Sequence, residues 1–97
     1  MALRFEWDAR KALISATKHG VSFEEARTVF GDLLSPTVAD QKHENGEFRF
    51  AIVGRTAAGR LVAVSHVERD DTIRIVSARL ADRREKRVYE EGQDDRP

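Results

Sequence analysis

Three stretches of alternating polar and apolar residues follow one another in the second half of the chain, with only short turns between them. They span 47–53, 61–69 and 73–79. A period of two is typical of half-buried β-strands. Ala58-Gly59 and Asp70-Asp71 are suitable turn residues between the stretches. Because connections this short join antiparallel neighbours, an antiparallel meander is predicted.

A short strand and a helix are predicted near the N-terminus. Apolar and charged residues alternate over 3–7, as in a half-buried strand. Asp8 then stands at a helix N-cap position, and Gly20 stands where a glycine can take the left-handed conformation that ends a helix. The residues at helical spacing between these two caps are Leu13, Ile14 and Thr17.

A second helix is predicted from a capping box. Ser22 and Glu25 stand three residues apart, so each side chain is expected to accept a hydrogen bond from a backbone N–H in the first turn. Gly31 and Asp32 are expected to end this helix. The apolar residues that share one of its faces are Phe23, Ala26, Val29 and Phe30.

The remaining segments complete a single α+β domain over residues 1–97. Residues 36–40 are predicted to form an irregular or edge strand, and Asn45-Gly46 a hairpin turn. Residues 82–91 read as a charged helix, and 92–97 as a frayed tail. The predicted order is therefore a short N-terminal strand, two helices, an antiparallel sheet of three to four strands and a C-terminal helix.

Composition excludes several classes of function. The 97 residues contain no cysteine, so neither a disulfide framework nor a thiolate nucleophile is available. No apolar run is long enough for a membrane span, and no signal peptide is recognised, so a cytoplasmic protein that does not bind membranes is expected. The 17 basic and 17 acidic side chains cancel, but ten of the eleven basic residues in 49–97 are arginine, whose planar fork suits phosphate oxygens.

Metal, cofactor and serine-hydrolase chemistry find no support in the sequence. His19, His43 and His66 lie on different predicted elements and show no ligand spacing. There is no G-x-S-x-G nucleophile motif, and the six glycines are scattered singly rather than gathered in a phosphate-binding loop. No metal site and no cofactor are therefore predicted.

Arginines on the predicted strands offer a different chemistry. Arg49, Arg69, Arg74 and Arg79 lie on strands about 4.8 Å apart, so guanidinium groups leaving one face are expected to converge on one phosphate. Together with Lys18-His19 at a helix end, they provide the parts for metal-free RNA cleavage. A base takes the 2′-hydroxyl proton, and fixed cations stabilise the extra negative charge of the transition state. DNA lacks this hydroxyl and would not be cut.

Two observations set limits on this hypothesis. Arg74 and Arg79 are five residues apart, so a regular strand would point them to opposite faces; only a bulge or a strand end brings them together. The alternative is that the arginines form the solvent face of a half-buried sheet and pair across strands with Glu47 and Glu68.

Four segments, taken in order, resemble the BrnT family of toxins over residues 3–91. They are Phe5-Glu6-Trp7-Asp8 with Lys18-His19-Gly20-Val21-Ser22-Phe23-Glu24-Glu25-Ala26; Asp40, His43 and Glu47-Phe48-Arg49; Glu68-Arg69-Asp70-Asp71-Thr72-Ile73-Arg74-Ile75-Val76-Ser77-Ala78-Arg79; and a helix with Arg84, Glu85 and Tyr89. Each segment alone is weak evidence, but their conjunction in this order and spacing is specific.

The resemblance implies a RelE-like fold and a toxin that degrades RNA and inhibits translation. It also implies a BrnA-like antitoxin with a ribbon-helix-helix domain, which represses the shared promoter and so connects the toxin to operator DNA. The residues implied to contact the substrate and transition state are Lys18, His19, Arg49, Arg69 and Arg79. Glu47 and Glu68 are implied to orient arginines or act as base, and Arg74 and His43 are weaker substrate-binding candidates.

Two matters stay open at this point. Lys18, His19 and the glutamates all remain possible general bases. The chain is alternatively a non-catalytic interaction module that binds the antitoxin and tunes its promoter binding, through exposed apolar residues of the second or the final helix.

Overall fold

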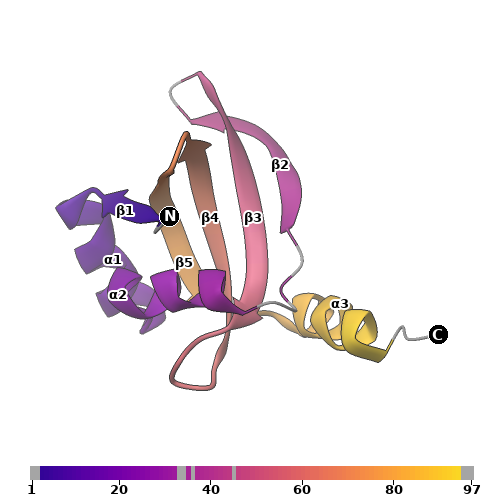
Figure 1. The fold of residues 1–97 in the computed structure, drawn as a ribbon. Coiled ribbons are helices and arrows are strands. Elements are labelled where there is room, and N and C mark those ends of the chain that lie inside the picture. The colour runs from indigo at the N-terminus through magenta and orange to yellow at the C-terminus, as the bar shows by residue number, and fades with distance from the viewer. Residues whose placement is uncertain (1–2, 33–34, 36, 45, 95–97) are drawn as a thin grey trace.

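The structure is a computed structural model that describes residues 3–32, 35, 37–44 and 46–94, with the backbone alone over 37–44 and 92–94. It is an α+β fold, as predicted (Figure 1). The elements are β1 (Arg4–Trp7), α1 (Ala9–His19), α2 (Phe23–Ala26), the 3₁₀ helix η1 (Arg27–Gly31), β2 (Thr37–Glu44), β3 (Glu47–Arg55), β4 (Leu61–Arg69), β5 (Thr72–Leu80) and α3 (Arg83–Asp94).

The strands form one five-stranded sheet in the order β1-β5-β4-β3-β2. Strands β3, β4 and β5 form the predicted antiparallel meander. The predicted edge strand pairs with β3 as β2, and it extends to Glu44 instead of ending at residue 40. The N-terminal strand β1 adds to the sheet in parallel beside β5, with Phe5 opposite Ile73. The sheet is thus mixed and has one strand more than the antiparallel sheet that was predicted.

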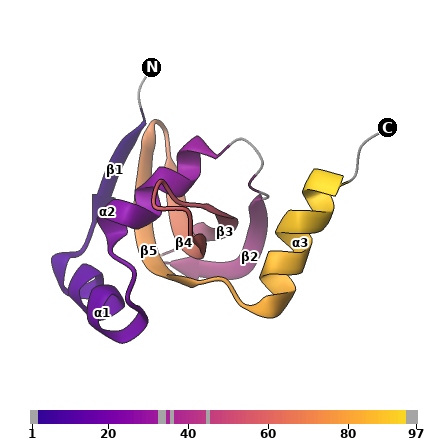
Figure 2. The ribbon, with the colours of Figure 1, turned by 90° about the horizontal axis from the view of Figure 1, so that it is seen from below.

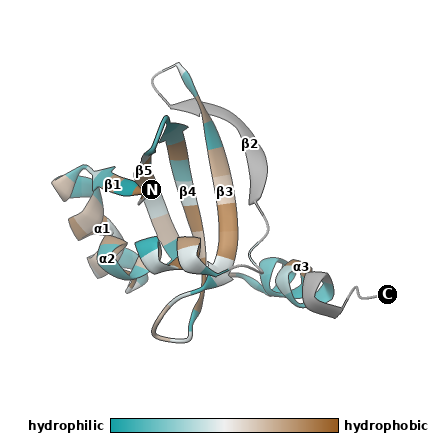
Figure 3. Cartoon of the chain, viewed as in Figure 1, coloured by the Kyte–Doolittle hydropathy of each residue, from teal (hydrophilic) through white to brown (hydrophobic). Residues whose placement is uncertain are grey.

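The sheet curls around a helical layer on its inner face. Figure 2 shows α2 and η1 lying inside the curl, α1 beside the β1–β5 side, and α3 at the opposite side. Strands β3 and β4 are apolar where α2 and η1 cross them and more hydrophilic toward their far tips (Figure 3). The buried core between these layers consists of Val21, Phe23, Ala26, Val29, Ile52, Val62, Val64, Ile73, Ile75 and Ala78.

Helix α1 has the predicted caps but buries an unexpected residue. The Asp8 carboxylate accepts hydrogen bonds from two backbone N–H groups of the first turn, and Gly20 closes the helix with a φ of 70°. Leu13 and Ile14, however, are 64% and 51% exposed, whereas Ser15 is buried. The Ser15 hydroxyl lies 2.8 Å from the Val21 carbonyl oxygen and 2.9 Å from that of Ala78. Helix α1 therefore packs on β5 through its small residues.

Only one of the two hydrogen bonds of the predicted capping box forms at the start of α2. The Ser22 hydroxyl accepts a hydrogen bond from the Glu25 N–H at 3.0 Å, as predicted. The Glu25 carboxylate was expected to reach back to the helix start, and this was wrong. It accepts hydrogen bonds from Thr56 Oγ1 at 2.8 Å and Arg60 Nε at 3.0 Å instead. An arginine is a stronger donor than a neutral N–H, so Glu25 ties the helical layer to the β3–β4 turn.

The C-terminal helix is longer than predicted. It runs to Asp94, so residues 92–94 are helical rather than frayed, and 95–97 lie outside the described residues. Asp82 and Glu85 form the reciprocal capping box here, with side-chain to N–H distances of 2.8 and 2.9 Å. Tyr89 is buried and donates to Asp32 Oδ2 at 2.7 Å, which fixes α3 to the end of η1.

Replacing Gly54 by alanine is expected to destabilise the fold by about 1–3 kcal/mol. A Cβ at this position of β3 lies 2.7 Å from Val29 Cγ1 and 2.8 Å from Ser35 Cβ, so η1 must shift away from the sheet. Urea unfolding followed by circular dichroism measures the effect. The matched control is Gly31→Ala, where a Cβ meets nothing within 4 Å. Equal stabilities of the two variants would contradict this account of the η1–sheet contact.

Candidate functional site

The outer face of the sheet, which the described helices leave uncovered, gathers most of the predicted arginines. The register places Glu6, Arg74, Val67 and Arg49 in one row across β1, β5, β4 and β3. Glu6 Oε2 lies 3.1 Å from Arg74 Nη1. Val67 lies between Arg49 and Arg74 in this row and is only 2% exposed.

A second row lies on the same face, two residues nearer the β4–β5 turn. It joins Arg4, Thr72 and Arg69 by register. Arg69 then makes two parallel bonds to Glu47 of β3, from Nε to Oε2 at 2.9 Å and from Nη2 to Oε1 at 2.5 Å. This fork-to-carboxylate geometry holds both side chains in a fixed orientation.

A β-bulge resolves the orientation of Arg79. Ser65 is opposite Ser77, but the next residue of β4, His66, is opposite Ile75, so Val76 is an extra residue on β5. The extra residue reverses the alternation beyond it. Arg79, opposite Ala63, therefore lies on the same face as Arg69 and Arg74. We call this surface, with Arg4, Arg49, Arg69, Arg74 and Arg79, the arginine face.

The arginine face is long, and its two ends are separate. Arg69 and Ala63, the neighbour of Arg79, are six residues apart on β4, which corresponds to about 20 Å. The prediction that all the strand arginines converge on one phosphate is therefore wrong, because Arg69 and Arg79 are too far apart. Arg79 instead pairs with Glu85 of α3 through two contacts of 2.8 Å.

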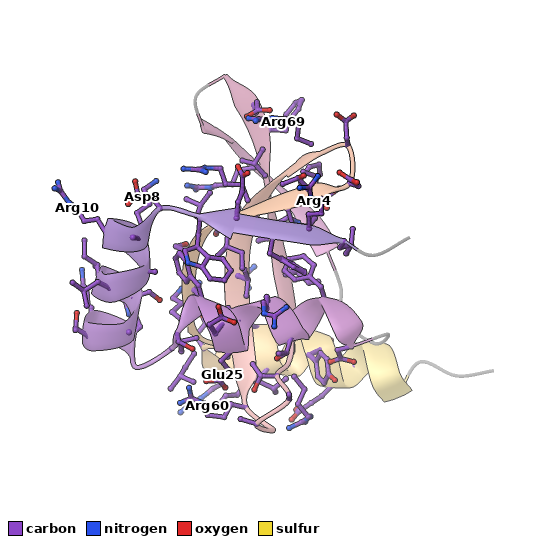
Figure 4. The ribbon with its side chains drawn as sticks, turned by 60° about the vertical axis from the view of Figure 1, so that its left-hand side comes forward. Arg4, Asp8, Arg10, Glu25, Arg60 and Arg69 are labelled. Atoms are coloured by element: carbon purple, nitrogen blue, oxygen red, sulfur yellow. The ribbon has the colours of Figure 1, made fainter. Side chains whose placement is uncertain are left out.

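Lys18 and His19 belong to the Arg79 end. Both are exposed in the last turn of α1. The adjacent Gly20 carbonyl accepts a hydrogen bond from Arg60 in the β3–β4 turn at 2.9 Å. Figure 4 shows Arg60 and Glu25 at one end of the molecule and Arg69 at the other. The predicted site residues thus form two groups rather than one cluster.

Glu68 faces the opposite side of the sheet from Arg69. Its Oε2 lies 3.0 Å from Nε2 of His66, which is fully buried between the rings of Phe30 and Phe50. Glu68 therefore does not orient the arginines, in contrast to its predicted role beside Glu47. The backbone of His43 in β2 pairs with Phe48 of β3, but the structure does not describe the His43 side chain.

Two of the ion pairs on this surface, at Glu47 and Glu85, lower the pKa of the carboxyl group. The hydrogen bond from Arg69 is the main cause of the lowered pKa of Glu47, and the bond from Arg79 lowers the pKa of Glu85 in the same way. Both groups are thus carboxylates at neutral pH, and their partner guanidinium groups have raised pKa values. A lowered pKa makes Glu47 a weaker base and a better positioning group for Arg69.

Two residues of the site, Arg4 and Glu6, were not predicted from the sequence. Their place depends on the parallel pairing of β1 with β5. The alternation over 3–7 puts both on the polar face of a strand, but it does not say which strand is the neighbour.

Among the described residues, no three histidine or acidic side chains gather closely enough to hold a metal ion. None of the helices in the described segments has the length and apolar character needed to cross a bilayer.

Comparison with known families identifies the chain. Residues 7–85 match the family model described as the ribonuclease toxin BrnT of type II toxin-antitoxin systems. The chain belongs to the BrnT family. The match contains both rows of the arginine face except Arg4 and Glu6, together with Arg79 and the first residues of α3.

The fold agrees with that of a solved member of this family. The crystal structure of the Brucella abortus ribonuclease toxin BrnT superposes with a TM-score of 0.65, covers 84% of this chain and all of that one, and is 19% identical. At this identity the likeness shows the fold. A search of curated proteins gives no match. The predicted BrnT-type toxin is thus confirmed as a family assignment.

The pKa of Glu47 is expected to lie below its ordinary value of 4.5 and to rise in Arg69→Ala, because the arginine bond favours the ionised form. A carboxyl carbon NMR titration measures this. The matched control, Arg60→Ala, should leave Glu47 unchanged and raise the pKa of Glu25. The sign for stability follows from linkage: the Glu47 contribution is complete above pH 4.5 and is lost as pH falls through the lowered pKa. An unchanged Glu47 pKa in Arg69→Ala would contradict the assignment.

Proposed function

We propose that the protein is an endoribonuclease toxin that cuts RNA without a metal ion by attack of the substrate's own 2′-hydroxyl. Two observations support this. The chain belongs to a family of ribonuclease toxins, and its sheet carries Arg49, Arg69 and Arg74 from three adjacent strands on one open face. The arrangement of these guanidinium groups carries the proposal, because phosphate oxygens that gain charge need several fixed cations.

The proposed reaction exchanges one phosphodiester bond for another. A base accepts the 2′-hydroxyl proton, the 2′-oxygen bonds to phosphorus, and the 5′-oxygen leaves and takes up a proton. The products are a 2′,3′-cyclic phosphate and a 5′-hydroxyl end. The five-coordinate transition state carries more negative charge on its oxygens than the ground state, so fixed guanidinium groups bind it more tightly and lower the barrier.

The geometry favours a division of roles between the two ends of the arginine face. Arg49, Arg69 and Arg74 lie in neighbouring rows and hold the reacting phosphate. Glu47 orients Arg69 through its bidentate pair. Glu6 is bonded to Arg74 through one oxygen only and lies beside these arginines, so it is our candidate for the base. Arg79, with Lys18 and His19 near its end of the sheet, contacts neighbouring nucleotides.

The biological setting is also proposed from the family. Membership of a type II toxin-antitoxin family implies a protein antitoxin as partner. We propose that this antitoxin has a ribbon-helix-helix domain, covers the toxin and links it to operator DNA. We further propose that the toxin has a RelE-like fold, acts on RNA in the cytoplasm and thereby inhibits translation.

One observation favours the alternative of an interaction module without catalysis. Arg69, Arg74 and Arg79 are each engaged by a carboxylate, so an RNA phosphate has to compete with Glu47, Glu6 and Glu85. The apolar residues expected to carry such binding on the second helix are largely in the core. The large apolar residues exposed on described helices are Leu13 and Ile14 of α1 and Val88 of α3. An absence of RNA cleavage by the purified protein would favour this reading.

Arg69→Ala is expected to slow RNA cleavage by about 10²–10³-fold, the usual cost of removing one transition-state donor. The assay uses the purified protein, a single-stranded RNA and EDTA, and follows the appearance of 2′,3′-cyclic phosphate ends. Arg49→Ala and Arg74→Ala should be slowed in the same direction. An RNA with a single 2′-deoxy group at the cut site should stay intact there.

The matched control is Arg27→Ala, which removes an exposed arginine paired with Glu24 on the helical side of the molecule. It should cut RNA at the normal rate, since exposed ion pairs contribute little to stability. Unfolding curves establish that each variant is folded. Normal cleavage by all three sheet variants would refute the proposed site, and an inactive native protein would refute the proposed activity.

A further inference from the structure

The outer surface of α3 carries a basic hollow apart from the arginine face. Arg83, Lys86, Arg87 and Glu90 line a hollow of about 420 Å³. Their spacing of three, one and three residues places them on one side of the helix. Glu85 and Tyr89 lie on the other side, where Glu85 binds Arg79 and Tyr89 is buried against Asp32. The hollow is therefore held in place by the inner side of the same helix.

The three cations of this hollow differ from the arginines of the sheet in that they lack a carboxylate partner among the described residues. Within the segments that the structure describes, Arg83, Lys86 and Arg87 have no carboxylate in ion-pair contact, whereas Arg69, Arg74 and Arg79 each have one. An anion approaching α3 thus displaces only water and mobile counterions. Three cations and the single acid Glu90 line the hollow, so it carries an excess of positive charge in a chain with zero net charge.

The hollow lies on α3, the element that follows the Arg79 end of the arginine face, on the side of this helix away from Glu85. Arg79 is the last arginine of β5, Arg83 is the first residue of α3, and the Arg79–Glu85 pair fastens the two elements together. A flexible polyanion that runs along β5 toward Arg79 reaches α3 next. A flexible single strand can bend around the helix from one cationic surface to the next, as strands do that follow charged surfaces through their backbone.

We propose that the α3 hollow, through Arg83, Lys86 and Arg87, binds the phosphodiester backbone of the RNA strand outside the cut site. The identity of the polyanion as RNA rests on the proposed function. The contact is independent of base sequence, because it involves charge and phosphate oxygens alone. Glu90 lines the same hollow and opposes the phosphate charge.

The test compares two triple variants that remove the same number of charges. Arg83→Gln/Lys86→Gln/Arg87→Gln changes the hollow, and Arg10→Gln/Lys11→Gln/Arg27→Gln changes the helices on the other side of the molecule. The probe is a short single-stranded RNA with 2′-O-methyl groups, which cannot be cut by the proposed reaction. Its affinity for the whole protein is measured by fluorescence anisotropy over a series of salt concentrations.

The α3 triple variant is expected to bind about tenfold more weakly near 0.1 M salt, and the slope of log affinity against log salt should fall by about 2, since each lost single-strand phosphate contact removes about 0.7. The control triple variant should retain the native slope. Glu90→Gln should bind more tightly, on the order of twofold, because it removes a charge that repels phosphate. On an RNA that can be cut, the α3 variant should raise KM and leave kcat unchanged.

The outcomes separate this inference from the proposed function. If the α3 triple variant keeps the affinity and salt slope of the native protein, the inference is overturned, even where Arg69→Ala abolishes cleavage. An acidic protein partner would then be the remaining candidate ligand of the hollow. Weaker binding by the α3 variant in a protein that cuts no RNA would uphold the hollow as an RNA contact and refute only the nuclease. An equal loss of RNA affinity in both triple variants would show that only the net charge of the protein matters, and this would also overturn the proposed α3 site.

Discussion

The extra residue Val76 in β5 determines which side chains share the arginine face. Before it, Ile73 and Ile75 are buried and Arg74 points outward; after it, Ala78 is buried and Arg79 points outward. Without the bulge, burying both Ile75 and Ala78 on one face of a regular strand would be impossible, since residues three apart point to opposite sides. The core therefore requires the bulge, and the common orientation of Arg74 and Arg79 is a consequence of core packing.

The paired carboxylates show how an arginine-rich sheet face remains compatible with folding. Five arginines on one side of a sheet repel one another, and Glu6, Glu47 and Glu85 each offset one of them by a direct contact. These pairs are exposed, so each contributes little free energy while it holds the guanidinium group in place. A phosphate that accepts two hydrogen bonds from the same guanidinium group can therefore displace the carboxylate. The bonds from Arg69 and Arg79 also lower the pKa values of Glu47 and Glu85, so these two pairs stay charged near neutral pH.

Local signals predicted well and non-local ones did not. Asp8, Gly20 and the turn at Asp70-Asp71 act through hydrogen bonds and backbone angles within a few residues, so the sequence around them was sufficient. The pairing of β1 with β5 joins residues nearly 70 positions apart and leaves no local trace, which is why Arg4 and Glu6 were missed.

The orientation of side chains was predicted only in part for the same reason. The capping box at Ser22 was expected to be reciprocal, but Arg60, 35 residues away, competes successfully for Glu25. The bulge left one trace in the sequence, the adjacent apolar residues Ile75 and Val76 in an otherwise alternating strand. Parity showed that a bulge was necessary for Arg74 and Arg79 to share a face, and the register supplied it.

The zero net charge of the chain does not indicate how strongly it binds a polyanion such as RNA. At physiological salt an exposed charge is screened within about 8 Å, so an RNA phosphate responds to the side chains beside it rather than to the total. On the sheet, arginines and glutamates alternate and their fields largely cancel until a phosphate displaces a carboxylate. On the outer side of α3 the cations have no such partner among the described residues. Binding strength is then expected to come mainly from the helix, and chemistry from the sheet, where the paired arginines are held in fixed orientations.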